Sequence, residues 1–210
     1  MVQVVVFDFD GVIVPSETLK QEAFKRIFSD FGEQVPETES DAARQEFSEA
    51  RGNRFDIIRS TLKRLGRESE DAVQRYAERY DAITRNEILQ LGVLPEVRNV
   101  LERLSKKYPL YINSNNPDGA LERTVSELGI AQYFKAFLGS SHSKRENLAS
   151  IAQRERVNGS EIVFVGDGEG DRRAAEIFGC RFIGIGDAVD EWNGRGFTVV
   201  RSVSEIEPHL

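Results

Sequence analysis

The hydrophobic and polar positions divide the chain into segments of two kinds. Residues 4–7 form a continuous run of β-branched and aromatic side chains, which predicts a strand buried on both faces in a parallel sheet. Between residues 16 and 91 the apolar side chains instead recur at the spacing of one helix face, without a strand pattern. This stretch predicts an all-helical insertion of about four helices. Its clearest stripes are Phe24, Ile27, Phe28 and Phe31; Phe55, Ile58, Leu62 and Leu65; and Val73, Tyr76, Tyr80 and Ile83.

From residue 92 onward, short apolar runs alternate with helical patterns. The alternation predicts a mainly parallel sheet with helices on both faces, and therefore a three-layer α/β core. We assign residues 1–15 and 92–210 to this core domain and residues 16–91 to an inserted helical domain. Further strands are predicted at residues 109–113, 136–138, 161–165, 181–185 and 197–200, and helices near Pro95, Leu121, Glu146 and Asp171.

Charge and composition narrow the classes of partner. The chain has 210 residues and a net charge of −7, which disfavours non-specific binding to nucleic acid or to an anionic membrane. An acidic surface still permits an anionic substrate in a locally basic pocket. The sequence has neither a long apolar segment that predicts a membrane span nor a secretory signal pattern at the N-terminus. Cys180 is the single cysteine, which excludes an intramolecular disulfide, and we expect a cytoplasmic protein.

Two carboxylates follow the first strand. Asp8 and Asp10 are separated by one residue and precede Gly11, which permits a sharp turn. Burying an ionised carboxylate is unfavourable unless it is paired or binds a metal, and ligand sites in parallel sheets lie beyond the carboxyl ends of the strands. If the backbone remains extended, both side chains point to the same face. The alternative is a strand that ends in solvent, with Asp10 beginning a turn.

A second apolar strand also ends in acids, because Asp167 and Asp171 follow the run at residues 163–165. Taken alone, Asp171 can cap the next helix and Asp167 can belong to an ordinary turn. Two buried strands that both end in carboxylates favour a shared hard cation, since like charges without a cation repel one another. Mg²⁺ prefers oxygen ligands and is often held by a few carboxylates together with a substrate phosphate.

The remaining candidates are polar residues near the ends of other elements. Ser114 and Asn115 follow the strand predicted at 109–113, and Lys144 lies near a helix start. In isolation, the first two suit a turn, and a lone lysine suits a solvated surface. Together with the acids, they supply a hydroxyl, an amide and an ammonium after different strands. That combination suits phosphoryl transfer, in which positioning and charge neutralisation dominate catalysis.

The order and spacing of these motifs resemble those of the haloacid dehalogenase superfamily of phosphatases, in the phosphoglycolate phosphatase and β-phosphoglucomutase-like branch that carries a helical cap. The segment at 8–12, Asp-Phe-Asp-Gly-Val, resembles the first motif. Ser114 with Asn115 resembles the second motif, Lys144 the third, and Asp167 with Asp171 the fourth. The resemblance covers nearly the whole chain and implies a Rossmann-like core with an inserted cap domain.

The resemblance implies roles for the four acids. Asp8 would attack phosphorus as the nucleophile, and Asp10 would protonate the leaving group and then activate water. The carboxylates of Asp8 and Asp167 and the backbone carbonyl of Asp10 would hold Mg²⁺. Asp171 would lie close to the ion and contact it directly or through water.

The resemblance assigns substrate recognition to the other candidates. Ser114 and Asn115 would bind phosphate oxygens, and Lys144 would offset the charge on the nucleophile and the phosphate. In the insertion, Asn53 and Arg54 lie between two predicted helices and resemble a loop that relatives point at the substrate. They are our candidates for contacting the leaving group, against the alternative of a helix-joining turn with solvated side chains.

The chain departs from the family pattern at three points. The tripeptide at 15–17, Pro-Ser-Glu, stands where relatives often have Asp-Ser-Glu. Arg145 and Glu146 follow Lys144 where many capped relatives are proline-rich, and Gly168 stands where serine is frequent. None of these differences removes a catalytic group, but they weaken assignment to a named subfamily.

We expect hydrolysis of a small phosphorylated metabolite, while the sequence leaves the leaving group and the oligomeric state open. A phosphomutase of the same superfamily uses the same acids, but capped mutases tend to place histidine and lysine in the cap, and this insertion has no histidine. Dehalogenase chemistry needs neither Mg²⁺ nor the second aspartate, and a phosphonate hydrolase would need a distinctive cap lysine. The non-enzyme alternative is a catalytically silent relative that binds a ligand.

Overall fold

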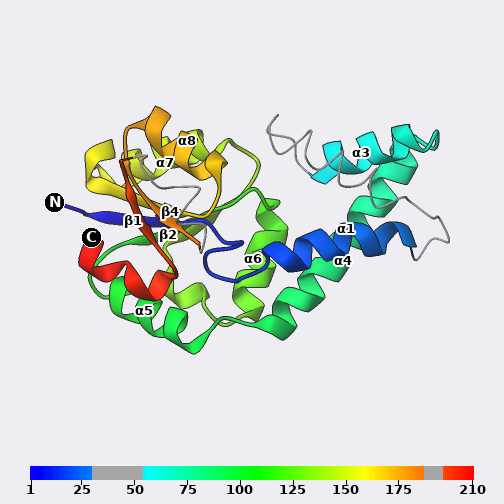
Figure 1. Cartoon of the computed structure of the whole chain (residues 1–210). Helices are drawn as coiled ribbons and strands as arrows, with labels where there is room; N and C mark the ends of the chain where they lie inside the picture. Colours follow the sequence, from blue (N-terminus) through cyan, green and yellow to red (C-terminus); the bar gives the residue numbers. More distant parts are fainter. Residues whose placement is uncertain (30–53, 187–195) are drawn as a thin grey trace. The chain divides into compact units, whose positions relative to one another are not determined.

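The computed structural model describes residues 1–29, 54–186 and 196–210 (Figure 1). The chain divides into two compact units. Residues 1–15 and 91–210 form the first, which we call the sheet unit, and residues 16–90 form the second, which we call the helical unit. Each unit contains a hydrophobic cluster of its own. The designation of the helical unit as a cap domain stays a prediction.

The described part of the sheet unit contains one parallel sheet with the strand order β3-β2-β1-β4-β5-β6. β1 (Val4–Phe7) lies between β2 and β4, so that Val6 is opposite Tyr111 on one side and Phe164 on the other. Because every pairing is parallel, the carboxyl ends of the strands meet at one edge of the sheet. The other strands are β2 (Leu110–Asn113), β3 (Ala136–Leu138), β4 (Ile162–Gly166), β5 (Arg181–Ile185) and β6 (Thr198–Val200).

Helices cover both faces of the sheet. Figure 1 places α7 and α8 on one side of the strands and α5 on the opposite side, and right-handed crossovers put α6 on the side of α5. Leu148 of α7 and Ala175 of α8 pack against Val4, Val6 and Phe164 in one buried cluster. These helices are α5 (Pro95–Ser105), α6 (Asp118–Glu127), α7 (Lys144–Glu155) and α8 (Glu169–Phe178), with short 3₁₀ turns at Ala131–Tyr133, Gly159–Glu161, Val203–Glu205 and Glu207–His209. The predicted three-layer α/β fold is confirmed.

The described residues of the helical unit form α1 (Glu17–Ser29), α3 (Arg54–Arg64) and α4 (Glu70–Leu91). The apolar stripes seen in the sequence become buried or partly buried faces of these helices, except that Leu65 follows the end of α3. Phe24 lies against Tyr80 with ring centroids 4.3 Å apart, and Phe28 stacks on Tyr76 at 4.8 Å. Phe31 of the first stripe lies outside the described residues.

None of the helices that the structure describes combines the length and the apolar character that crossing a bilayer requires. α4 spans 22 residues, yet it carries charged side chains throughout. Its stripe of buried positions packs against α1 and α3 within the helical unit. Packing inside its own unit therefore explains the apolar stripe of α4.

Candidate active site

β1 brings Asp8 to the carboxyl edge of the sheet. The Asp8 N–H donates to the Val165 carbonyl at 2.8 Å, which continues the pairing with β4 by one residue. The backbone then turns, because the Phe9 carbonyl accepts a hydrogen bond from the Ile13 N–H at 2.9 Å. Asp10 therefore does not follow Asp8 along an extended strand, which differs from the arrangement considered from the sequence.

The turn nevertheless keeps the Asp10 side chain buried near the same edge. Its Oδ2 accepts a hydrogen bond from Asn116 Nδ2 at 2.7 Å. Asn116 lies in the loop after β2, where its backbone N–H also donates to Ser114 Oγ at 3.2 Å. Sequence reasoning selected Ser114 and Asn115 in this loop and missed Asn116. The run of three polar residues at 114–116 was the available signal.

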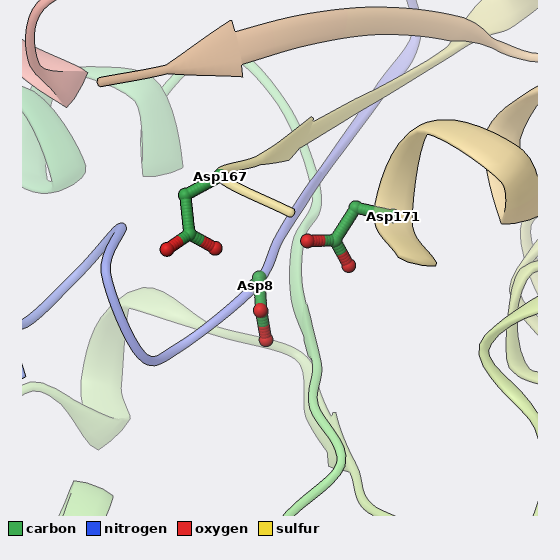
Figure 2. A group of neighbouring side chains, drawn as sticks. All are labelled: Asp8, Asp167 and Asp171. Atoms are coloured by element: carbon green, nitrogen blue, oxygen red, sulfur yellow. The ribbon is translucent and has the colours of Figure 1, made fainter. Parts of the chain in front are cut away.

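Three carboxylates converge beyond β1 and β4. Asp8, Asp167 and Asp171 each offer one oxygen, and these oxygens all lie within 4.8 Å of one another. Figure 2 shows their origin: Asp8 follows β1, Asp167 follows β4, and Asp171 lies in the first turn of α8. The structure thus brings together the acids that the two apolar strand ends singled out. Hard oxygen ligands at this separation suit a divalent cation such as Mg²⁺.

Two glycines allow the acids to approach so closely. Gly11 adopts φ +73°, and a Cβ at this position would overlap the Asp167 carboxylate. A Cβ on Gly166 would overlap the Asp171 side chain. Any side chain at either position would therefore push an acid out of the cluster. Gly11 in addition supplies the left-handed backbone conformation that the turn after β1 requires.

Lys144 places a cation among the carboxylates. Its Nζ lies 3.0 Å from Asp8 Oδ2 and 2.5 Å from Asp171 Oδ1, and its side chain is 10% exposed. Burial disfavours the ammonium, but the neighbouring carboxylates of Asp171 and Asp8 outweigh burial and raise the pKa of Lys144. The ammonium is therefore a fixed positive charge at this edge of the sheet.

The electrostatics of Asp8 differ from those of an exposed aspartate. Burial raises the pKa of Asp8 to about 7, Lys144 acts in the opposite direction, and the charges of Asp171 and Asp10 raise it further. Four acids and one ammonium leave the described site with a net negative charge when all are ionised. That surplus of negative oxygen ligands fits a divalent cation.

Asp171 has two structural contacts of its own. Its Oδ1 accepts the hydrogen bond from Lys144 at 2.5 Å, and its Oδ2 accepts the Gly168 N–H at 3.2 Å at the start of α8. Asp171 thus contributes to the cap of α8 from the third helical position, while Gly168 is the N-cap residue, and the same carboxylate also belongs to the acidic cluster.

Ser114 and Asn115, the predicted phosphate-binding residues, differ in burial. Ser114 is buried, and its backbone N–H donates to the Leu138 carbonyl at 2.9 Å, which holds the residue at the ends of β2 and β3. Asn115 is exposed on the same loop. Ser114 therefore lies at the edge that carries the acids, while the role of Asn115 stays a prediction.

The structure describes one of the two candidates in the helical unit. Asn53 lies outside the described residues. Arg54 is the first residue of α3, and its Nη2 donates to Asp81 Oδ2 at 2.9 Å while its Nε lies 2.8 Å from Oδ1. Its guanidinium also lies 4.7 Å from the centre of the Phe55 ring. Arg54 is therefore anchored within its own unit, and its contact with a leaving group stays a prediction.

The sequence profile of the haloacid dehalogenase-like hydrolases matches residues 2–179, which include every residue of the acidic cluster. The chain belongs to this family. Among curated relatives of this haloacid dehalogenase-like hydrolase, phosphoglycolate phosphatase from Escherichia coli K12 is 26% identical over 130 residues, which cover 56% of this chain and 51% of the relative. The enzyme of that name from Pectobacterium atrosepticum is 28% identical over 143 residues, with 64% and 61% covered. The chain thus spans about half of the length of the curated relatives it matches.

Solved structures share the fold over nearly the whole chain. A haloacid dehalogenase-like hydrolase from Streptococcus pneumoniae has a TM-score of 0.73 at 20% identity, covering 99% of this chain and 98% of the other. A β-phosphoglucomutase from Clostridium difficile has a TM-score of 0.74 at 18% identity, covering 99% and 94%. A hydrolase of the family from Bacillus subtilis bound to magnesium has a TM-score of 0.76 at 16% identity, covering 100% and 98%. At these identities, the likeness shows the fold alone.

Replacing Gly11 with alanine tests the close approach of Asp167. We expect Gly11→Ala to unfold about 1–3 kcal/mol more easily and to lose most of its thermal stabilisation by Mg²⁺, because the new methyl group displaces the carboxylate of Asp167, a predicted metal ligand. Gly129→Ala is the matched control, since Gly129 also has φ +64° but nothing lies within 4 Å of its added Cβ. Thermal denaturation with and without Mg²⁺ gives the comparison. An equal response to Mg²⁺ in both variants would contradict the role of Gly11.

The raised pKa of Asp8 predicts pH-dependent metal binding. Because Asp8 ionises more readily in the unfolded chain, the metal-free fold loses stability as the pH rises from 3.8 to about 7. A bound cation removes that penalty. Below pH 7, protons compete with Mg²⁺, so we expect affinity to be about tenfold lower at pH 6 than at pH 8. Calorimetric titration with Mg²⁺ at both pH values measures the ratio of the two affinities. In Asp8→Asn the affinity should no longer differ between the two pH values. An affinity independent of pH in the unaltered protein would count against this account.

Proposed function

We propose that the chain is a Mg²⁺-dependent phosphatase that hydrolyses a small phosphorylated metabolite through an aspartyl-phosphate intermediate. The observation that carries the proposal is the Lys144 ammonium, which contacts Asp8 and Asp171 where Asp167 supplies a third carboxylate. A buried cation beside converging carboxylates is preorganised for a phosphoryl group and a divalent ion. Membership of a hydrolase family whose matched relatives include phosphoglycolate phosphatases supports the same reaction class.

Asp8 is the nucleophile in this proposal. Its Oδ1 accepts the Phe9 N–H at 2.7 Å and its Oδ2 lies 3.0 Å from Lys144 Nζ, so the carboxylate is held in one orientation. An Asp8 oxygen forms a bond to phosphorus while the bond from phosphorus to the leaving-group oxygen breaks. Water then attacks the phosphorus of the aspartyl phosphate, which returns the Asp8 carboxylate and releases inorganic phosphate.

Asp10 serves as general acid and then as general base. It protonates the departing oxygen in the first step and takes a proton from the attacking water in the second. The hydrogen bond from Asn116 holds one carboxyl oxygen of Asp10 at 2.7 Å. We therefore assign Asn116 the role of orienting this group during both proton transfers.

The oxygen ligands of the site fit Mg²⁺. The Asp8 and Asp167 carboxylates and the Asp10 backbone carbonyl would hold the ion, which supplies positive charge that stabilises the phosphoryl group during transfer. Both Asp171 oxygens already accept hydrogen bonds, from Lys144 and from the Gly168 N–H. These bonds favour contact between Asp171 and the ion through water.

Ser114 and Lys144 would bind the phosphoryl oxygens. The Ser114 Oγ accepts the Asn116 N–H, which leaves the hydroxyl hydrogen to be donated to a phosphate oxygen. The Lys144 ammonium carries three hydrogens, two of which point to Asp8 and Asp171, and the third is available to the phosphate. Asn115, exposed on the same loop, is proposed as a further contact to the phosphate.

Substrate choice is assigned to the helical unit acting as a cap. Arg54 and Asn53 are the proposed contacts to the leaving group. The hydrogen bond from Nη2 to Asp81 and the close ion pair hold the Arg54 guanidinium in place, and a guanidinium suits recognition of an anionic or hydroxylated group. Because phosphoglycolate phosphatases are among the matched relatives, we propose a small phosphorylated acid as the substrate of this chain.

Replacing the nucleophile gives the first test. We expect Asp8→Asn to lower kcat by several orders of magnitude, because an amide does not attack phosphorus, while the fold remains intact by circular dichroism. Asp71→Asn, a change of the same type on exposed helix surface, should retain full activity. Phosphate release is measured over a panel of phosphate esters with Mg²⁺ and with a chelator. Retention of near-normal turnover by Asp8→Asn would refute the assignment, and an isomeric sugar phosphate without free phosphate would identify a mutase.

The proposed role of Arg54 gives a separate test. We expect Arg54→Ala to raise KM for phosphorylated acids about tenfold and to leave kcat within about twofold on an aryl phosphate whose ring carries no charged substituent, because the change removes the proposed contact to an anionic leaving group. Arg59→Ala is the control on the same helix, since Arg59 is paired with Glu70 at 2.7 Å. Kinetics on both substrate types separate the two effects. If the ratio of KM for phosphorylated acids to KM for the aryl phosphate is the same in Arg54→Ala as in the unaltered protein, Arg54 does not belong to the recognition site.

A further inference from the structure

A buried amide network lies at the start of α7, and the chemistry proposed above does not use it. Asn113 is the last residue of β2 and is 0% exposed, while Asn147 lies one turn into α7 and is 4% exposed. Asn147 Nδ2 donates to Asn113 Oδ1 at 2.9 Å and to the Gly139 carbonyl at 3.0 Å. Asn113 Nδ2 donates to the Lys144 carbonyl at 2.9 Å.

The two main-chain carbonyls determine the direction of every hydrogen bond in this network. The carbonyls of Gly139 and Lys144 can only accept, so each must face an amide nitrogen. Asn147 therefore turns both hydrogens of its Nδ2 outward, one to Gly139 and the other to Asn113 Oδ1. Asn113 then presents its own nitrogen to Lys144. These three hydrogen bonds fix one orientation of the two amides and offset part of the penalty for burying them.

The network connects β2, β3 and α7, and residues of the proposed site belong to α7 and to the loop after β2. Asn113 directly precedes Ser114, Gly139 directly follows β3, and Lys144 is the first residue of α7. The other device at this helix start is the capping box between Ser143 and Glu146, which is exposed and closes only within the helix. The amide network thus links the start of α7 to the ends of β2 and β3.

We propose that Asn113 and Asn147 are positioning residues, which hold the first turn of α7 so that the Lys144 ammonium reaches both Asp8 and Asp171. The inference rests on the proposed function of this site for its kinetic consequence, although not for its structural one. Lys144 must bridge two carboxylates from different elements, at 3.0 Å and 2.5 Å. A shift of its backbone by about 1 Å would break one of these contacts and would also change the distance from the ammonium to Ser114.

The test begins with Asn147→Leu, which keeps the branched shape but removes both donations of the Asn147 amide, and with them the bond that orients Asn113 toward the Lys144 carbonyl. We expect kcat on a generic aryl phosphate to fall by about tenfold or more, with a smaller change in KM. A readout independent of turnover is the acetylation rate of individual lysines by an activated acetate ester, followed by peptide mass spectrometry. Lys144 should label slowly in the unaltered protein and about tenfold faster in Asn147→Leu, relative to the 68% exposed Lys106.

Two further variants separate positioning from stability. The double variant Asn113→Leu with Asn147→Leu leaves no unpaired side-chain amide, so its Tm should recover above that of Asn147→Leu. Its kcat should remain low and its Lys144 should still label rapidly, because the Lys144 carbonyl has lost its partner. Ile151→Ala, a buried apolar change one turn further along α7, should lower Tm while leaving kcat and Lys144 labelling near those of the unaltered protein.

The outcomes are distinct. The proposal is overturned if kcat and Lys144 labelling follow Tm across all three variants, since the network would then contribute stability alone. It is also overturned if Asn147→Leu leaves Lys144 labelling unchanged. If the unaltered protein releases no phosphate from any ester, the proposed function fails, yet the labelling rates still decide whether the network positions Lys144.

Discussion

The proposed site depends on how several buried negative charges are held together at one edge of a parallel sheet. β1 and β4 are neighbours with parallel register, so Asp8 and Asp167 emerge side by side, and α8 adds Asp171. Such a cluster is unfavourable in a low-dielectric environment without compensating positive charge. Lys144 provides part of the compensation through its contacts with Asp8 and Asp171. The charge that remains is the physical reason to expect a divalent ion and, with it, an anionic substrate.

Several neighbouring residues hold these charged side chains in place. Gly11 and Gly166 provide space that any Cβ would remove, so the acids can approach one another. The amide of Asn116 fixes Asp10, which belongs to the same edge but faces the loop after β2. Asn113 and Asn147 fix the start of α7, from which Lys144 projects. Each of these groups constrains the direction or the distance of a charged side chain, which is what phosphoryl transfer demands of a protein.

The sequence predicted the strands well because the central strands are buried on both faces and therefore appear as short continuous apolar runs. It also identified Asp8, Asp167, Asp171 and Lys144, whose proximity follows from parallel strand order and the resemblance of their motifs. The sequence indicated a turn at Gly11 but left open whether the backbone stays extended to Asp10, since that depends on hydrogen bonds to the Phe9 carbonyl. Helix α7 begins at Lys144, two residues before the predicted position near Glu146, because the Ser143 capping box sets its start. The pairs formed by Asn116 with Asp10 and by Arg54 with Asp81 join distant residues that no local pattern relates.

The most direct measurement of the central claim is a crystal structure of the protein with Mg²⁺ and inorganic phosphate. The account predicts one ion bound by the carboxylates of Asp8 and Asp167 and by the Asp10 backbone carbonyl. The phosphate should lie between that ion, the Ser114 hydroxyl and the Lys144 ammonium, with phosphorus facing an Asp8 oxygen. An ion bound elsewhere, or a phosphate that contacts neither Asp8 nor Lys144, would contradict the account.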